Sequence, residues 1–232
     1  MKLAVLLFFA LAVMTAHHTP PIPVLVELFT SEGCSSCPPA DELLRKLQAQ
    51  PVDGVQLITL SEHVDYWDYI GWKDPNATPQ LTARQHEYAK RFGARGSYTP
   101  QMIVDGEFEF VGSDSRALAR AVEQTVKRQK VPLKLALNGR TLSIELEGTP
   151  PPGAEMILAV TQNNVASSVT RGENSGRRLM HDSVVRQWQS LGEATATKES
   201  VVPAGAGGET AVVFLQDKRS RRVLGAASIQ LP

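Results

Sequence analysis

The residues best suited to chemistry are Cys34 and Cys37, the only two cysteines of the chain. Their C-x-x-C spacing is typical of a redox-active dithiol, of half a zinc site or of a short structural disulfide. Structural zinc usually needs four Cys or His ligands, whereas His63, His86 and His181 are scattered along the sequence. A disulfide across two intervening residues closes almost no loop, so it constrains the unfolded chain little. The spacing therefore favours redox chemistry and leaves an inert disulfide and a metal site as alternatives.

The elements on either side of the two cysteines favour the redox interpretation. The branched, apolar run Ile22–Thr30 predicts a buried strand before them, and the leucine spacing in Ala40–Gln50 predicts an amphipathic helix after them. A thiolate between a strand and a helix N-terminus is stabilised by backbone N–H groups and the helix dipole, which lowers the pKa of the thiol. We expect Cys34, the outer residue, to be the nucleophile and Cys37 to be the resolving thiol.

The rest of the chain divides into two segments that differ in their predicted secondary structure. Up to residue 130 the pattern predicts strands and helices in alternation, with elements at Val55–Leu60, Leu81–Phe92, Pro100–Val104, Glu107–Val111 and Ser115–Gln129. Beyond it only strands are predicted, at Leu133–Leu137, Thr141–Leu146, Met156–Thr161, Thr195–Val202, Thr210–Gln216 and Val223–Leu231. We therefore expect a domain over residues 20–130 and a β-rich, sandwich-like domain over residues 131–232.

The N-terminus carries a targeting pattern. Met1-Lys2 supplies a basic start, Leu3–Val13 is apolar, and small residues follow up to Ala16. This run is too short to span a bilayer but suits a signal peptide over residues 1–19, with an uncleaved anchor as the alternative. We expect an exported protein, periplasmic or extracellular, without stable membrane insertion after cleavage and in a compartment where disulfides persist.

Composition and charge exclude some partners. The chain has 232 residues, 42% of them hydrophobic, which is enough to bury a core. Its 24 Lys and Arg residues balance 24 Asp and Glu residues, so it has no long-range field that would attract phosphate backbones. We expect no nucleic-acid partner and no cofactor.

Three segments resemble the thioredoxin superfamily: the strand Val24–Phe29, Cys34-Ser35-Ser36-Cys37 opening a helix, and Thr99-Pro100 opening a later strand. The resemblance implies that Pro100 follows a cis peptide bond and faces the dithiol, and that Thr99 faces the substrate. An ordinary trans proline is the alternative. The resemblance also implies that Glu27 is a buried acid with a raised pKa, moving protons at the resolving thiol; the alternative is a Glu27 on a solvated edge.

One departure from thioredoxin concerns the helix start. Thioredoxin has its proline between the cysteines, whereas this chain has Ser35-Ser36 there and Pro38-Pro39 afterwards. Proline fits only the first turn of a helix, so we expect the helix to start close to Cys37. Cys34 would then lie further from the dipole than in thioredoxin.

A closer resemblance covers nearly the whole mature chain. The segments ELFTSEGCSSCPPAD, SEHVDYWDYIGWKDP, YTPQMIVDG and RGENSGRRLMHDSVVR resemble, in this order, a family of secreted bacterial proteins labelled as a domain of unknown function. That family pairs a thioredoxin-like domain with a β-rich part. The resemblance implies an α/β thioredoxin-like fold and export rather than a particular reaction.

Two further segments have open roles. Glu62–Pro75 is aromatic, and a wall beside the dithiol is one interpretation of it, but we expect its aromatic side chains to serve packing rather than ligand contacts. His63 is either a base near Cys34 or, as we expect, a hydrogen-bonded structural residue. Arg171–Arg186 is basic and is expected to be a solvated hairpin or a surface for an acidic partner.

The leading hypothesis is a thiol–disulfide oxidoreductase of the bacterial cell envelope, acting on a protein or a small thiol or disulfide. The second is a non-catalytic binding protein with a fixed Cys34–Cys37 disulfide. The third is a metal carrier using Cys34, Cys37 and His63. The direction of electron flow cannot be read from the motif, because dithiols of similar sequence differ widely in potential.

Overall fold

The computed structural model describes residues 20–50, 52–203 and 207–232. The expected signal peptide, residues 1–19, lies outside the described residues. Within these ranges, none of the helices is both long enough and apolar enough to cross a membrane.

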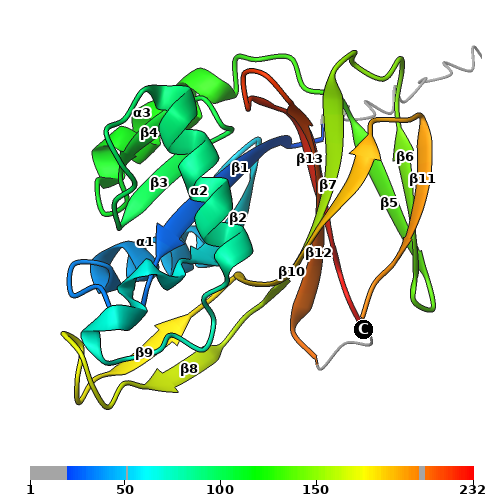
Figure 1. Ribbon diagram of the computed structural model, residues 1–232. Helices are drawn as coiled ribbons and strands as arrows, with labels where there is room; N and C mark the ends of the chain where they lie inside the picture. Colours follow the sequence, from blue (N-terminus) through cyan, green and yellow to red (C-terminus); the bar gives the residue numbers. More distant parts are fainter. Residues whose placement is uncertain (1–19, 51, 204–206) are drawn as a thin grey trace, which may run out of the picture.

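The first half of the chain alternates strands with helices (Figure 1). Its elements are β1 (Ile22–Thr30), α1 (Pro38–Ala49), β2 (Val55–His63), the 3-10 helix η1 (Asp65–Ile70), α2 (Pro79–Phe92), β3 (Gln101–Val104), β4 (Phe108–Val111) and α3 (Ser115–Thr125). Local chemistry sets several boundaries: the Thr78 side chain accepts from Leu81 N at the start of α2, and Gly93 ends that helix with φ +65°. Asp105-Gly106 forms the turn between β3 and β4.

The second half consists of strands. They are β5 (Leu133–Asn138), β6 (Thr141–Leu146), β7 (Ala154–Gln162), β8 (Val165–Ser168), β9 (Arg178–His181), β10 (Val184–Glu193), β11 (Thr197–Val201), β12 (Glu209–Asp217) and β13 (Val223–Gln230). The six predicted strands are present, and β8, β9 and β10 are strands that the sequence pattern did not reveal.

One large mixed sheet runs through both halves of the chain. Its strand order is β13-β12-β7-β10-β2-β1-β3-β4, and β10 joins β2 through the pair Val184 and Ser61. The predicted α/β thioredoxin-like domain followed by a separate β domain is therefore wrong, because the described chain is mostly β and its largest sheet has eight strands drawn from both segments (Figure 1). The division at residue 130 stays a prediction, although the sheet crosses it.

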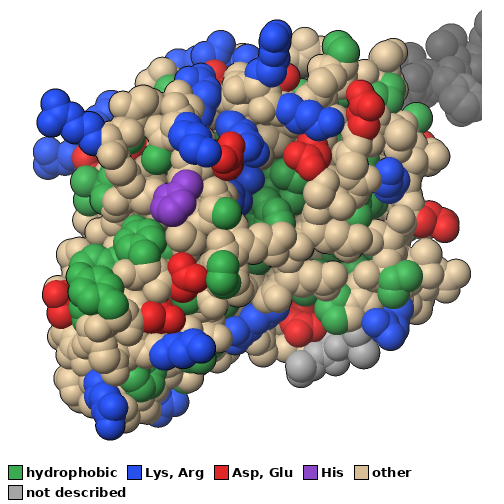
Figure 2. Space-filling view, in the orientation of Figure 1, with side chains coloured by type: hydrophobic (Ala, Val, Ile, Leu, Met, Phe, Trp, Pro, Cys, Tyr) green, Lys and Arg blue, Asp and Glu red, His purple; other side chains and the backbone are tan. Residues whose placement is uncertain are grey.

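Apolar side chains cover both faces of this sheet. Helices α1 and α3 pack through Leu44 and Leu118 on the face of β1 that carries Val26 and Leu28, while Leu81 and Tyr88 of α2 lie on the opposite face. A three-stranded sheet, β11-β6-β5, packs on the β7 and β12 side, and β8 with β9 forms a separate hairpin. On the face shown in Figure 2, basic and acidic side chains are interspersed.

Candidate active site

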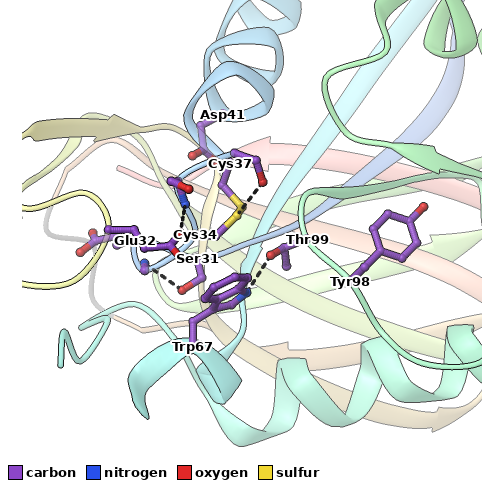
Figure 3. Close-up of a disulfide and its surroundings, with 12 residues drawn as sticks. Ser31, Glu32, Cys34, Cys37, Asp41, Trp67, Tyr98 and Thr99 are labelled. Atoms are coloured by element: carbon purple, nitrogen blue, oxygen red, sulfur yellow. Dashed lines mark hydrogen bonds between the residues drawn. A yellow bond between two sulfur atoms is a disulfide. The ribbon is translucent and has the colours of Figure 1, made fainter. Parts of the chain in front are cut away.

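Cys34 and Cys37 form a disulfide between the end of β1 and the start of α1, with their Cα atoms 5.4 Å apart (Figure 3). Cys37 is the N-cap of α1, and the helix begins at Pro38, close to Cys37 as the proline pair predicted. Pro38 and Pro39 have no N–H groups, so the first helical N–H groups belong to Ala40 and Asp41, and both bond to Cys37 O. Both cysteines are 0% exposed.

Pro100 lies near the first turn of α1, the helix that begins at the dithiol. The Thr99–Pro100 peptide bond is cis, which confirms the predicted isomer. Gly112 shows where the proline lies, because a Cβ atom built there would be 3.0 Å from Pro100 Cβ and 3.1 Å from Ala40 Cβ, in the first turn of α1. The roles of Pro100 and Thr99 in substrate binding stay predictions.

Trp67 of η1 forms one wall of the site. Its Nε1–H donates to Thr99 Oγ1 at 2.8 Å. Its Cβ lies close to the Cα of Gly33, since a Cβ added to that glycine would be 3.0 Å away. Figure 3 shows the indole beside the disulfide.

The loop between β8 and β9 covers the other side of the site. Asn174 is 0% exposed, and its Nδ2 donates to Glu32 O at 2.8 Å and to Cys34 O at 3.0 Å. Glu173 Oε2 accepts from Ser35 N at 3.1 Å. The basic segment Arg171–Arg186 thus belongs to a hairpin, as expected. Its tip is not wholly solvated, because it binds the cysteine loop, the stretch between β1 and α1 that carries Cys34 and Cys37.

Glu27 is buried, which excludes the solvated edge, but it lies away from the resolving thiol. It points to the α2 face of the sheet, opposite α1, where Arg84 Nε donates to it at 2.7 Å and Tyr88 OH at 2.6 Å. The Trp188 ring stacks on the Arg84 guanidinium group, whose Cζ lies 4.3 Å from the ring centroid. This ion pair attaches α2 to the sheet. The structure therefore does not bring Glu27 together with Cys37.

A second carboxyl group on that face, Glu62, is fully buried. Its oxygens have no hydrogen-bond partner among the described residues, and Arg84 Nε is 3.5 Å away. Burial and the neighbouring Glu27 carboxylate raise the pKa of Glu62 well above its usual value.

A different group of buried ionisable residues surrounds the start of α1. His181 of β9 has Nδ1 3.8 Å from Asp41 Oδ2 and Nε2 3.5 Å from Glu32 Oε1. Burial by itself would lower the pKa of His181, but these two carboxylates raise it to about 10. Burial alone would likewise raise the pKa of Glu32, but the nearby His181 ring, and after it the hydrogen bond that Trp72 Nε1 donates, lower it. His181 is therefore charged and paired at neutral pH.

His63 completes this group from the end of β2. Its Nδ1 is 2.7 Å from Asp74 Oδ2, and its ring lies edge-on to that of His181, with centroids 4.7 Å apart. Burial would raise the pKa of Asp74, but His63 and two backbone N–H donors lower it to about 2. His63 is thus a buried, hydrogen-bonded residue.

Sequence reasoning missed Asp41, Glu32, His181 and Asn174. Asp41 offers one local signal, since a carboxylate four residues after Cys37 falls on the same helical face. Asn174 lies 140 residues from Cys34 and no local pattern pairs them. Across the described ranges, no group of three His, Cys, Asp or Glu side chains is arranged to hold a metal ion.

Comparisons with known proteins bear on the fold and the family. A family model described as "Protein of unknown function (DUF1223)" matches residues 25–216. The crystal structure of protein AGR_C_4864 from Agrobacterium tumefaciens is 28% identical, with a TM-score of 0.73 over 92% of this chain and 99% of that one. HBP35 of Porphyromonas gingivalis is 16% identical, with a TM-score of 0.63 over 92% of this chain and 76% of that one, and is similar in fold alone. None of the curated proteins matches the chain.

Proposed function

The chain belongs to the DUF1223 family, whose function is unknown, and we propose that it catalyses thiol–disulfide exchange through Cys34 and Cys37. The observation that carries this proposal is the surroundings of the disulfide. It lies directly before a helix, near a cis proline, and next to a buried carboxyl group on that helix, Asp41. A helix N-terminus stabilises a thiolate, and a neighbouring acid–base group handles its proton.

The exchange proceeds in two displacements. A substrate thiolate attacks Cys34 Sγ and forms a mixed disulfide, while the bond between the cysteines breaks and Cys37 leaves with its electron pair. A second substrate thiolate then attacks the substrate sulfur that is bonded to Cys34. The two substrate sulfurs form a disulfide, and Cys34 leaves as a thiolate. The substrate is oxidised by two electrons and the protein dithiol is reduced; the reverse sequence reduces a substrate disulfide. A protein thiol or a small thiol serves equally in this scheme.

Access to Cys34 requires part of its cover to open. Both sulfur-bearing residues are buried, whereas Ser35 and Ser36 between them are exposed. Trp67 and the tip of the β8–β9 hairpin lie on the two sides of the motif. We propose that a substrate sulfur enters between these two walls, over the exposed serines.

The test uses glutathione disulfide as the probe. In a Cys37→Ser variant, reduced beforehand, Cys34 attacks the probe and retains one glutathione, detected as an added mass. The matched Cys34→Ser variant has one thiol in the same loop and should acquire the adduct far more slowly. Equal labelling of both variants, or no labelling of either, contradicts the assignment of Cys34 as nucleophile.

A fixed structural disulfide is the second candidate, and the complete burial of both cysteines favours it. The reduction potential separates the two. A value near or above roughly −270 mV is that of exchange catalysts, and a value below about −300 mV is that of a stable disulfide. The exported location expected from residues 1–19 remains part of the proposal; whether those residues are cleaved is tested by N-terminal sequencing of the protein recovered from the producing cells.

A further inference from the structure

Asp41 stands one helical turn after Cys37 at the start of α1. Cys37 has helical backbone angles, φ −76° and ψ −38°, so the two side chains leave the same face of the helix. Asp41 is 7% exposed and Cys37 0%. Figure 3 shows Asp41 next to Cys37. A proton released by the Cys37 thiol in this dry site therefore has a carboxylate as a nearby acceptor.

The hydrogen bonding around Asp41 is incomplete in the disulfide form. Asp41 Oδ1 and both ring nitrogens of His181 make no hydrogen bond to any residue that the structure describes. Buried polar atoms are normally bonded, so three such atoms in one cluster need an explanation. A disulfide sulfur has no proton to donate, whereas the reduced Cys37 has an S–H group that can donate to Asp41.

We propose that Asp41 and His181 hold the proton that Cys37 gains when the disulfide opens and loses when it forms. This deepens the exchange function and rests on it. On opening, Cys37 leaves as a thiolate; Asp41 passes it the proton of the charged His181, and His181 becomes neutral. On closing, the Cys37 thiol returns its proton by the same route, and its sulfur lone pair attacks Cys34 while the bond from Cys34 to the substrate breaks.

The surrounding charges keep a proton on His181 in the disulfide form. Glu32 of the cysteine loop and Asp74, which follows η1, contribute negative charge, and His63 of β2 lies against the His181 ring. Arg186 of β10 is a positively charged residue near this cluster, and its Nη1 donates to Asn76 Oδ1 at 2.7 Å. The Asp41 and Glu32 carboxylates account for the raised pKa of His181, about 10, and keep a proton on the pair at neutral pH.

The experiment measures opening and closing of the disulfide in the full chain. Dithiothreitol opens it, the linear disulfide of 2-mercaptoethanol closes it, and alkylation of free thiols followed by mass measurement gives both rates. We expect Asp41→Asn and His181→Gln each to slow both directions at least tenfold at pH 7, since positioned acid–base groups contribute roughly 10²- to 10⁴-fold.

Two controls separate proton transfer from a structural role. Glu42→Gln removes the adjacent carboxylate, which is 43% exposed and paired with Arg45, and should leave both rates unchanged. Asp41→Glu should recover most of the loss. Unchanged rates in folded Asp41→Asn or His181→Gln overturn the proposal, and so does a shifted equilibrium constant with an unchanged opening rate. The reagents need no client, so this outcome is distinct from a failure of glutathione labelling at Cys34.

Discussion

Asn174 holds the cysteine loop in place from the other half of the chain, and replacing it with alanine tests how strongly. Its Nδ2 donates to Glu32 O and Cys34 O at 2.8 and 3.0 Å. Cys34 O also accepts from Cys37 N, so it keeps a partner in the variant. Glu32 O accepts from no other donor in the described part of the chain.

The expected loss follows from these two bonds. A hydrogen bond contributes about 1 kcal/mol net, and a buried carbonyl left without a donor costs about 1–3 kcal/mol. Asn174→Ala therefore lowers the free energy of unfolding by about 2–4 kcal/mol. Urea unfolding of the oxidised protein, followed by tryptophan fluorescence, measures this loss.

Ser175→Ala is the matched control for this variant. Ser175 is the next residue in the same loop, and its exposed hydroxyl donates to Thr170 O at 3.0 Å. Exposed substitutions of this kind change stability by about 0.5 kcal/mol or less. If Asn174→Ala is no more destabilised than Ser175→Ala, the loop does not depend on the hairpin and the reasoning is refuted.

Three further predictions concern other parts of the fold. Arg84→Met should cost about 3–5 kcal/mol in urea unfolding, because it leaves the buried Glu27 carboxylate without its cation. His181 has a folded pKa of about 10, above the usual value of about 6.5, so its charge stabilises the fold fully below about pH 6.5 and ceases to do so as the pH rises towards 10. The difference in unfolding free energy between wild type and His181→Gln should therefore shrink across that range. Gly106→Ala should fail to fold or lose several kcal/mol, since the added Cβ would lie 1.8 Å from Arg221 O at a φ of +66°.

A specific result would contradict each of these three predictions. An Arg84→Met loss no larger than that of Arg45→Met, which breaks an exposed ion pair, contradicts the role given to the buried pair. A wild-type advantage over His181→Gln that grows with pH reverses the predicted sign. A Gly106→Ala protein of normal stability excludes the close approach of Arg221.

Local features were predictable from the sequence. The strand Ile22–Thr30 has the bounds that its branched residues indicated, and the start of α1 follows from the proline pair at 38 and 39. These succeed because the controlling interactions lie within a few residues. The pairing of Cys34 with Cys37 is of the same kind.

The architecture and the acid near Cys37 were not predictable in the same way. Strand β10 reads VVRQWQSLGE, with few buried positions, and its place in the sheet depends on antiparallel pairing with β7 and a short parallel pairing with β2 at Val184 and Ser61. Glu27 looked like the acid for the resolving thiol, but successive strand residues point to opposite faces, and its position sends it to α2. Which face a helix covers is decided by tertiary packing.

The junction between β2 and β10 also bears on the order in which the chain folds. Thr59 and Ser183, whose hydroxyls lie 2.7 Å apart at this junction, are separated by 124 residues. The hairpins β5–β6 and β12–β13 close short loops, whereas this junction closes a very long one, at a larger cost in chain entropy. We expect the two parts of the eight-stranded sheet to form first and to join last. During synthesis, the edge of β2 then waits for its partner until almost the whole chain has emerged.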